Sequence, residues 1–133
     1  MLGELIAELK GKNMGQRILD SDSPAIETNT SFTGSINGIS VKVLVTFVVK
    51  PRSAGVLHGE GQGVIMGGES ETATVKGEAY GKISSSGSVK WRAAVFFRSN
   101  STGQLASLNN VVGVAESEGD GEGNVTEKWW EWK

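Results

Sequence analysis

The sequence feature that most constrains the fold is Asn37-Gly38, a dipeptide that lies between two runs of alternating apolar and polar residues. In the run from Ala25 to Ile36, the large apolar residues occupy even-numbered positions. In the run from Ile39 to Lys50, every odd-numbered residue is apolar. Alternation is typical of a strand with one buried face, and Asn-Gly supplies the two positive-φ residues of a type I′ turn. The sequence therefore predicts an antiparallel hairpin over residues 25–50.

Five later segments show the same period of two and are predicted strands: residues 56–66, 72–83, 88–99, 111–118 and 125–133. One face of the first two carries mostly small side chains, among them Gly59, Gly61, Gly63, Gly77 and Gly81. Small side chains let a sheet coil sharply and leave volume for bulky groups from across the core. Trp91 and Phe97, on the apolar face of the segment 88–99, are expected to fill that volume.

The N-terminal segment is ambiguous, because the apolar residues of Met1–Lys12 fit a helical stripe as well as a strand. Gly3 and Gly11 favour the strand, since glycine is unfavourable inside a helix. The tripeptide that begins at Gly11 then predicts a hairpin into a second strand at Arg17–Leu19. Ser21–Pro24 is predicted to be a turn-rich link.

Eight or nine strands joined by short turns must be antiparallel to their neighbours, and so many strands rarely remain an open sheet. The connection Ser101–Asn110 is expected to hold at most one helical turn, packed through Leu105 and Leu108. We therefore predict an all-β fold, a single closed antiparallel up-and-down β-barrel, because closure removes edge strands. A two-sheet β-sandwich is the alternative. With 133 residues the chain is expected to have one core, and residues 1–133 one β-barrel domain.

Composition excludes several classes of protein. The formal net charge of −2 provides no basic field for nucleic acid or an anionic membrane, so we expect neither as a partner. The absence of cysteine excludes disulfides and thiolate chemistry, and it fits a reducing compartment. No apolar run approaches the roughly 18 residues of a membrane span, and the N-terminus lacks the pattern of a secretion signal. We expect a soluble, cytoplasmic protein.

An acidic segment near the C-terminus fits the spacing of an EF-hand calcium loop, with candidate ligands Glu116, Glu118, Asp120, Asn124 and Glu127 and a glycine, Gly121, at the sixth position. The first position is Glu where Asp is nearly always required, and the eighth is Gly where an apolar residue is usual. The flanking segments also have the pattern of strands rather than helices. We therefore favour an ordinary hairpin turn, with calcium binding as the alternative.

A second candidate site consists of His58, Glu60 and Gln62, which share one face of a predicted strand. The Cα atoms of successive members are about 6.6 Å apart. His58 is the only histidine, and its unperturbed pKa suits general acid or base catalysis at neutral pH. If this face points into the barrel, His58 and Glu60 are candidate catalytic residues, and Glu60 is expected to meet Arg92 or Arg17. If it points outward, it is an ordinary polar surface. A metal needs more ligands than are near in sequence, so we expect no metal and no cofactor.

Large aromatic side chains are more numerous than the core is expected to need. They include Tyr80, Trp91, Trp129, Trp130 and Trp132. Trp91 and at least one C-terminal tryptophan are expected to lie inside. Phe96, by contrast, shares a basic face with Lys90, Arg92 and Arg98. An outer wall with such aromatics predicts a subunit interface, so we expect a homo-oligomer, a dimer or larger.

Four segments of the chain resemble a family of small bacterial and archaeal β-barrel proteins of unassigned function: Glu60–Gly63, Trp91–Arg98, Leu105–Asn109 and Gly123–Lys133. The resemblance covers most of the chain from Gly55 onward and, more weakly, residues 3–19. It implies no catalytic residue, because the family has no established activity. The predicted fold is also similar to the barrels of allene oxide cyclases and lipocalins, a similarity of fold that carries no function.

Three functional classes stay open. The leading hypothesis is a non-catalytic barrel that oligomerises and holds a small, largely apolar ligand in its lumen. Its candidate ligand-binding residues are His58, Glu60, Gln62, Tyr80, Trp91 and Arg92. The alternative is a cofactor-free isomerase, cyclase or lyase, in which His58 and Glu60 move a proton and Arg92 or Tyr80 stabilises the developing charge. The third class is a structural or protein-interaction module.

Overall fold

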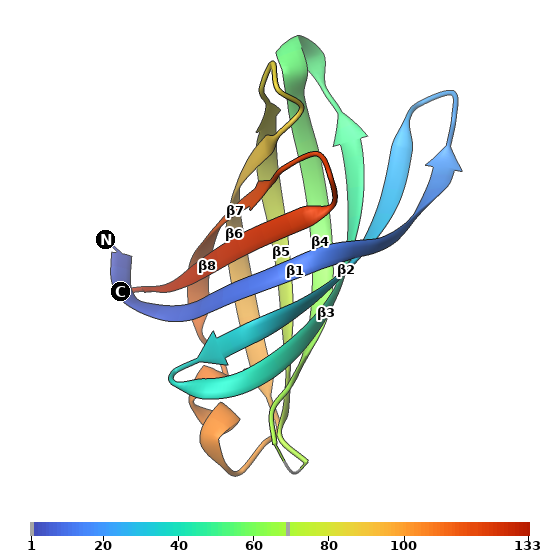
Figure 1. The fold of residues 1–133 in the computed structure, drawn as a ribbon. Coiled ribbons are helices and arrows are strands. Elements are labelled where there is room, and N and C mark those ends of the chain that lie inside the picture. The colour runs from blue at the N-terminus through green and yellow to red at the C-terminus, as the bar shows by residue number, and fades with distance from the viewer. Residues whose placement is uncertain (1, 69) are drawn as a thin grey trace.

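The computed structural model describes residues 2–68 and 70–133, and antiparallel strands dominate it (Figure 1). The strands are β1 (Leu2–Asp20), β2 (Ala25–Ile36), β3 (Ile39–Pro51), β4 (Val56–Met66), β5 (Thr72–Ile83), β6 (Val89–Ser99), β7 (Val112–Gly119) and β8 (Asn124–Trp132). Two short 3-10 helices, η1 (Ser53–Gly55) and η2 (Gln104–Leu108), lie between β3 and β4 and between β6 and β7. Within these described ranges, no helix is long and apolar enough to span a membrane.

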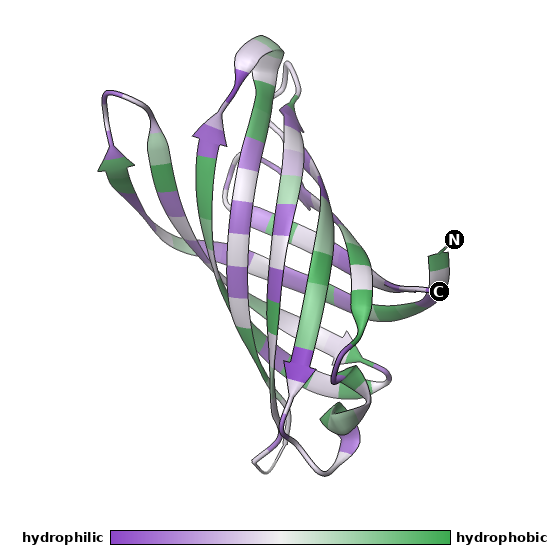
Figure 2. Cartoon of the chain, turned by 180° about the vertical axis from the view of Figure 1, so that it is seen from behind, coloured by the Kyte–Doolittle hydropathy of each residue, from purple (hydrophilic) through white to green (hydrophobic). Residues whose placement is uncertain are grey.

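The strands form one closed barrel in chain order, with each strand antiparallel to the next and β8 paired with β1. This arrangement confirms the predicted up-and-down barrel and excludes the β-sandwich. Hydrophilic and hydrophobic bands alternate along the strands, as expected of walls with one inward and one outward face (Figure 2). The predicted turn is confirmed as well, because Asn37 and Gly38 have φ values of 50° and 80°.

The first strand differs from its prediction. β1 continues without a turn to Asp20, so the hairpin expected to begin at Gly11 is wrong. Gly11 is required for close packing instead, because a Cβ atom there would lie 2.7 Å from Cδ1 of Phe32. Met1, where the predicted strand begins, lies outside the described residues.

The β1–β2 hairpin extends beyond the barrel wall. Pairing of β1 with β8 ends at Lys12, whereas pairing with β2 continues to Asp20 (Figure 1). A bulge between Asn13 and Gly15 interrupts the register at the point where the strand leaves the wall. The chain reverses at residues 21–24, as the sequence predicts.

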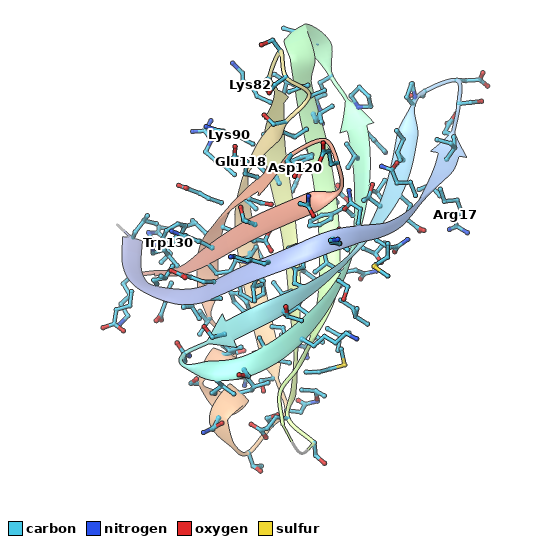
Figure 3. The ribbon with its side chains drawn as sticks, viewed as in Figure 1. Arg17, Lys82, Lys90, Glu118, Asp120 and Trp130 are labelled. Carbon is cyan, nitrogen blue, oxygen red and sulfur yellow. The ribbon has the colours of Figure 1, made fainter. Side chains whose placement is uncertain are left out.

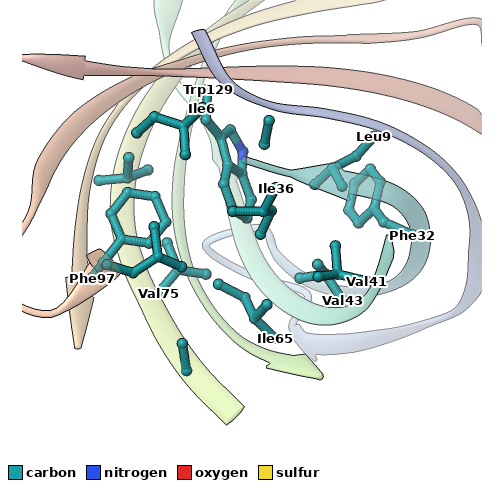
Figure 4. Close-up of a cluster of buried hydrophobic side chains, with 14 of the residues drawn as sticks. Ile6, Leu9, Phe32, Ile36, Val41, Val43, Ile65, Val75, Phe97 and Trp129 are labelled. Atoms are coloured by element: carbon teal, nitrogen blue, oxygen red, sulfur yellow. The ribbon is translucent and has the colours of Figure 1, made fainter. Parts of the chain in front are cut away.

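Along the barrel axis, the interior is divided into a closed half and an open half. The closed half lies at the end that carries η2, and large buried side chains fill it (Figure 4). They include Ile6, Leu9, Phe32, Ile36, Val41, Val43, Ile65, Val75, Phe97 and Trp129. Phe97 packs against Trp129 with ring centroids 5.2 Å apart. Leu105 and Leu108 of η2 are also fully buried, so the predicted helical turn seals this end of the core.

The open half lies toward the β1–β2, β3–β4, β5–β6 and β7–β8 turns. Its inward positions on four neighbouring strands carry small side chains, namely Gly59, Ala79, Gly81, Ala93, Ala115, Ser117 and Gly119. The sheet therefore closes in this half without filling its interior.

Glycines make room for one of the two predicted aromatic residues. Cβ atoms on Gly59 and Gly81 would lie 3.0 Å and 2.8 Å from ring atoms of Trp91, which confirms the expectation for this side chain. Phe97 instead lies against Gly113 of β7, where a Cβ atom would be 3.3 Å from its ring. The difference arises because Phe97 lies six residues further along β6 and belongs to the closed half.

Candidate functional site

A cavity of about 800 Å³ occupies the open half of the lumen. Residues from six strands line its deeper part, including Thr30, Phe47, Ala79, Ala93, Ala115 and Glu127. The next inward residues toward the closed end, among them Val95 and Trp129, belong to the hydrophobic core. The cavity therefore ends where the large core side chains begin. Its volume is typical of sites for small molecules, which occupy roughly 300–1,000 Å³.

One wall of the cavity, on β1 and β2, is polar. The hydroxyl of Thr30 donates a hydrogen bond to Oδ1 of Asn13 at 2.9 Å. Nε2 of Gln16 donates to Oγ1 of Thr28 at 3.3 Å. Each hydrogen bond uses part of the bonding capacity of its own two side chains. Their remaining donors and acceptors are available to a ligand.

Glu127 of β8 provides a buried carboxyl group at the floor of the cavity, with 8% of its surface exposed. Its cross-strand neighbours are Leu9 on β1 and Ser117 on β7. Burial raises the pKa of Glu127 from 4.5 to about 7, and a side-chain hydrogen bond with Trp129 acts in the opposite direction. The charge of this carboxyl group therefore changes near neutral pH.

Glu127 was not predicted to be a lumen residue, because its position fits the spacing of an EF-hand loop. A usable signal is nevertheless present. Val125, Glu127 and Trp129 alternate on one face of the last strand, and Glu127 is the ionisable member of an otherwise apolar set. A single carboxyl group on the core face of a strand indicates either a buried ion pair or a functional group.

The structure places His58, Glu60 and Gln62 on the outer surface of the barrel, so the interpretation that they face the lumen is wrong. The glycines that alternate with them face inward instead. The physical reason is the crowding of this part of the interior by the rings of Trp91 and Phe47, which leave no room for larger side chains on β4. Ligand binding by these three residues stays a prediction.

His58 has partners on the neighbouring strand. Its Nε2 lies 2.7 Å from Oε1 of Glu78, and its ring meets that of Tyr80 edge to face at 5.4 Å. These neighbours leave only 6% of His58 exposed, although it lies on the outer wall. The guanidinium of Arg52 in turn lies 5.8 Å from the centre of the Tyr80 ring. The imidazole is therefore part of a surface cluster.

The remaining predicted site residues are divided between the two faces. Trp91 lines the cavity, whereas Tyr80 and Arg92 pair side by side on the outer wall. The basic face of β6 also points outward, as Lys90 shows in Figure 3. Arg17, a candidate partner of Glu60, instead pairs with Glu27, with Nη2 3.2 Å from Oε1. The prediction that Arg92 or Tyr80 stabilises charge in the lumen is therefore wrong.

The described residues offer one group of side chains with the spacing of a metal site, and it lies outside the lumen. One ligand atom each from His58, Glu60 and Glu78 lie within 4.8 Å of one another. One imidazole and two carboxylates form a donor set that divalent transition metals accept. The hydrogen bond between His58 and Glu78 accounts for part of this arrangement without a cation.

The candidate calcium ligands near the C-terminus do not converge. Glu116 and Glu118 are exposed on the outer wall of β7, whereas Glu127 faces the lumen. The carboxylate of Asp120 accepts hydrogen bonds from the backbone N–H of Glu122 and from the backbone and side chain of Asn124. These bonds lower the pKa of Asp120 and hold the β7–β8 turn together. The segment is a hairpin turn, as favoured by the sequence.

Comparison with known proteins identifies the fold. No protein-family model and no curated protein matches this chain. A solved structure of a protein with unknown function from Clostridium acetobutylicum is similar, with a TM-score of 0.81, 14% identity and coverage of 98% of each chain. A conserved protein of unknown function from Rhodopseudomonas palustris has a TM-score of 0.76, 9% identity and coverage of 99% of each chain. The chain thus shares an eight-stranded barrel fold with bacterial proteins of unknown function.

Proposed function

We propose that this protein binds a small, largely apolar molecule in the open half of its lumen. The observation that supports this function is the cavity of about 800 Å³, which is lined mainly by apolar groups and has a few polar groups on one wall and at its floor. Such a combination is typical of ligand sites, in which apolar contacts supply affinity and polar groups fix orientation. Barrels of about eight strands are wide enough to hold one small ligand.

The shape of the cavity also favours a ligand over an imperfectly packed core. It is continuous with the turns at the open end, so a small molecule has a route of entry. Trp91 and Phe47 contribute aromatic side chains to its lining. Unfilled space beside apolar side chains costs stability, and a bound apolar molecule would restore the missing contacts.

Native mass spectrometry of protein purified without denaturation tests this function. We expect an added mass that organic extraction releases as a small apolar compound. The control is Ala93→Leu, because Ala93 lines the cavity and a leucine side chain would occupy it. This variant should lose the added mass and keep its far-UV circular dichroism spectrum. Equal masses without adduct for both proteins, together with no binding of an added apolar fluorescent probe by either, would contradict the proposal.

A cofactor-free isomerase, cyclase or lyase is the second candidate function, with a different proton-transfer group from the one predicted. His58 and Glu60 lie outside the lumen, whereas Glu127 faces it with a pKa of about 7. A carboxyl group with this pKa exchanges protons efficiently at neutral pH. Incubation of the extracted ligand with protein in D₂O should then introduce deuterium at carbon, and Glu127→Gln should abolish the exchange. Equal exchange by both proteins would exclude this role.

We also propose that copies of the chain associate through the outer wall of β3, β4 and β6. Leu44 and Val64 lie directly opposite each other on β3 and β4 and are 46% and 44% exposed, and Phe96, beyond β5 on the same side of the barrel, is 55% exposed. Monomeric proteins rarely expose large apolar patches. Light scattering should give at least twice the chain mass of 14.0 kDa. Phe96→Lys should reduce it to the monomer. A monomeric mass for the wild type at micromolar concentration would overturn this proposal.

A further inference from the structure

The charged groups of the cavity have one sign. Its lining contains two ionisable side chains, Glu127 at the floor and Asp120 near the mouth, and among the described residues that line it there is no Lys, Arg or His. The carboxylate of Asp120 is exposed and bonded within its own turn. Glu127 is therefore the group that decides which head group a ligand presents to the floor of the lumen.

No positive charge from the protein faces Glu127. Its neighbours on the two adjacent strands are Leu9 and Ser117, and along its own strand the inward side chains are those of Val125 and Trp129. The lysines of β1 and β8 at this level point to the outer surface. A carboxylate in such a position loses water without gaining a counter-ion, which is costly unless a ligand supplies one.

Two aromatic rings of the cavity favour the same kind of ligand. Trp91 and Phe47 both line the lumen. The face of an aromatic ring attracts cations, tryptophan most strongly, and this attraction increases where water is excluded. An acidic floor with aromatic walls thus selects against anionic ligands and in favour of cationic ones.

We propose that the ligand of this lumen is an amine, an apolar body with one ammonium group that donates hydrogen bonds to Glu127. This inference rests on the proposed ligand-binding function and specifies its ligand class. The hydroxyl and amide groups of Asn13, Thr28 and Thr30, on the neighbouring wall formed by β1 and β2, line the same cavity. They offer acceptors for further ammonium protons or for a polar substituent.

Binding of simple probes tests the ligand class. n-Octylamine, 1-octanol and octanoate share an eight-carbon chain and differ in the charge of the head group. We expect isothermal titration at pH 8 to give about tenfold or greater preference for octylamine over octanol, the size of a charge-assisted hydrogen bond, and the weakest binding for octanoate. This comparison uses the wild-type protein alone, so it does not depend on how a variant folds.

Two variants test whether the carboxyl group of Glu127 causes the preference for octylamine over octanol. Glu127→Gln should reduce the ratio of octylamine affinity to octanol affinity to about one. The matched control Glu78→Gln makes the same chemical change on the outer wall and should alter neither affinity. Between pH 8 and pH 5.5 the preference should shrink up to about 30-fold in the wild type, because protonation of Glu127 competes with the ammonium group. The groups that face Glu127 from β1, β7 and the lumen do not titrate in this range.

The outcomes separate this inference from the function on which it rests. Equal affinities for octylamine and octanol, or an octylamine preference that survives Glu127→Gln, would overturn the amine assignment and leave lumen binding intact. Binding of none of the three probes, by a protein that also carries no added mass, would overturn both.

Discussion

The closed and open halves of this barrel are built from the same strands, yet they differ in what fills them. In the closed half, inward positions carry large side chains such as Phe97 and Trp129, which are almost completely buried. In the open half, many inward positions of β4 to β7 carry glycine, alanine or serine beside the larger Trp91, and a cavity of about 800 Å³ remains. Backbone pairing is complete around the closed half, whereas in the open half β1 separates from β8 beyond Lys12. The size of the inward side chains then distinguishes the core from the binding cavity.

Carboxyl groups in the lumen and on the outer wall of the barrel also lie in different environments. Glu127 lies at the boundary between core and cavity without a cation beside it, whereas Glu78 on the outer wall pairs with His58 and is largely exposed. The same functional group thus has a pKa near neutrality inside and an ordinary surface role outside.

We expect mutations in the closed half to change stability, those in the open half to change ligand binding, and those on the outer wall to change little.

The largest expected effect is that of Phe97→Ala in the closed half. Phe97 is 1% exposed and packs against Trp129, so truncation leaves a cavity among side chains that cannot collapse. We expect the free energy of unfolding to fall by about 3–5 kcal/mol in urea denaturation. A loss below about 1 kcal/mol would show that this half is not the main source of stability.

The next effect is a pH dependence that comes from Glu127. Its pKa in the folded protein, about 7, lies above the ordinary value of 4.5. The folded state therefore holds this proton more tightly than the unfolded state, so the stabilising contribution is complete below pH 4.5 and is lost as the pH rises through 7. From pH 5 to pH 8 the wild type should lose about 2–3 kcal/mol that Glu127→Gln does not lose. Parallel urea titrations of both proteins measure this difference, and identical pH profiles would contradict it.

A matched pair on one face of β6 compares the two halves directly. Val95 is 7% exposed in the core, whereas Val89 lines the cavity. We expect Val95→Ala to cost about 2 kcal/mol and Val89→Ala less than about 1 kcal/mol, because only the first loses close contacts. Equal losses in thermal or chemical denaturation would mean that the open half is packed as tightly as the closed one.

The smallest expected effect belongs to the outer wall. Glu78→Gln weakens the contact with His58, but the Glu78 side chain is 62% exposed, so its loss should cost less than about 1 kcal/mol. Denaturation at pH 6, with ligand binding measured in parallel, checks both expectations. A larger loss of stability, or a loss of lumen binding, would show that the outer cluster contributes to the interior site.

The sequence predicted the architecture well because its signals are local. Alternation along β2 and β3 and the two positive-φ residues Asn37 and Gly38 define that hairpin without reference to the rest of the chain. The prediction failed at Gly11, because a glycine that permits close packing against Phe32 has the same appearance in a sequence as one that permits a turn. Distinguishing the two requires the partner strand.

The candidate site was predicted less well for a related reason. Of the six predicted ligand-binding residues, Trp91 alone lines the lumen. The alternation of His58, Glu60 and Gln62 with glycines was correctly recognised, but alternation does not say which of two faces is inward. Glu127 was considered only as the twelfth position of an EF-hand spacing, because spacing along the chain was considered without the face on which each residue lies.

By itself, the sequence determined that this chain forms antiparallel strands joined mostly by tight turns and closes into a barrel. These properties follow from side-chain periodicity and from backbone conformations that few residues adopt. Only the tertiary structure decided the facing of β4, the division of the lumen into core and cavity, and the burial of Glu127. These properties depend on contacts between residues that are far apart in the sequence. The rings of Trp91 and Phe47 exclude larger side chains from the inward face of β4, and burial removes water from the carboxyl group of Glu127 on β8.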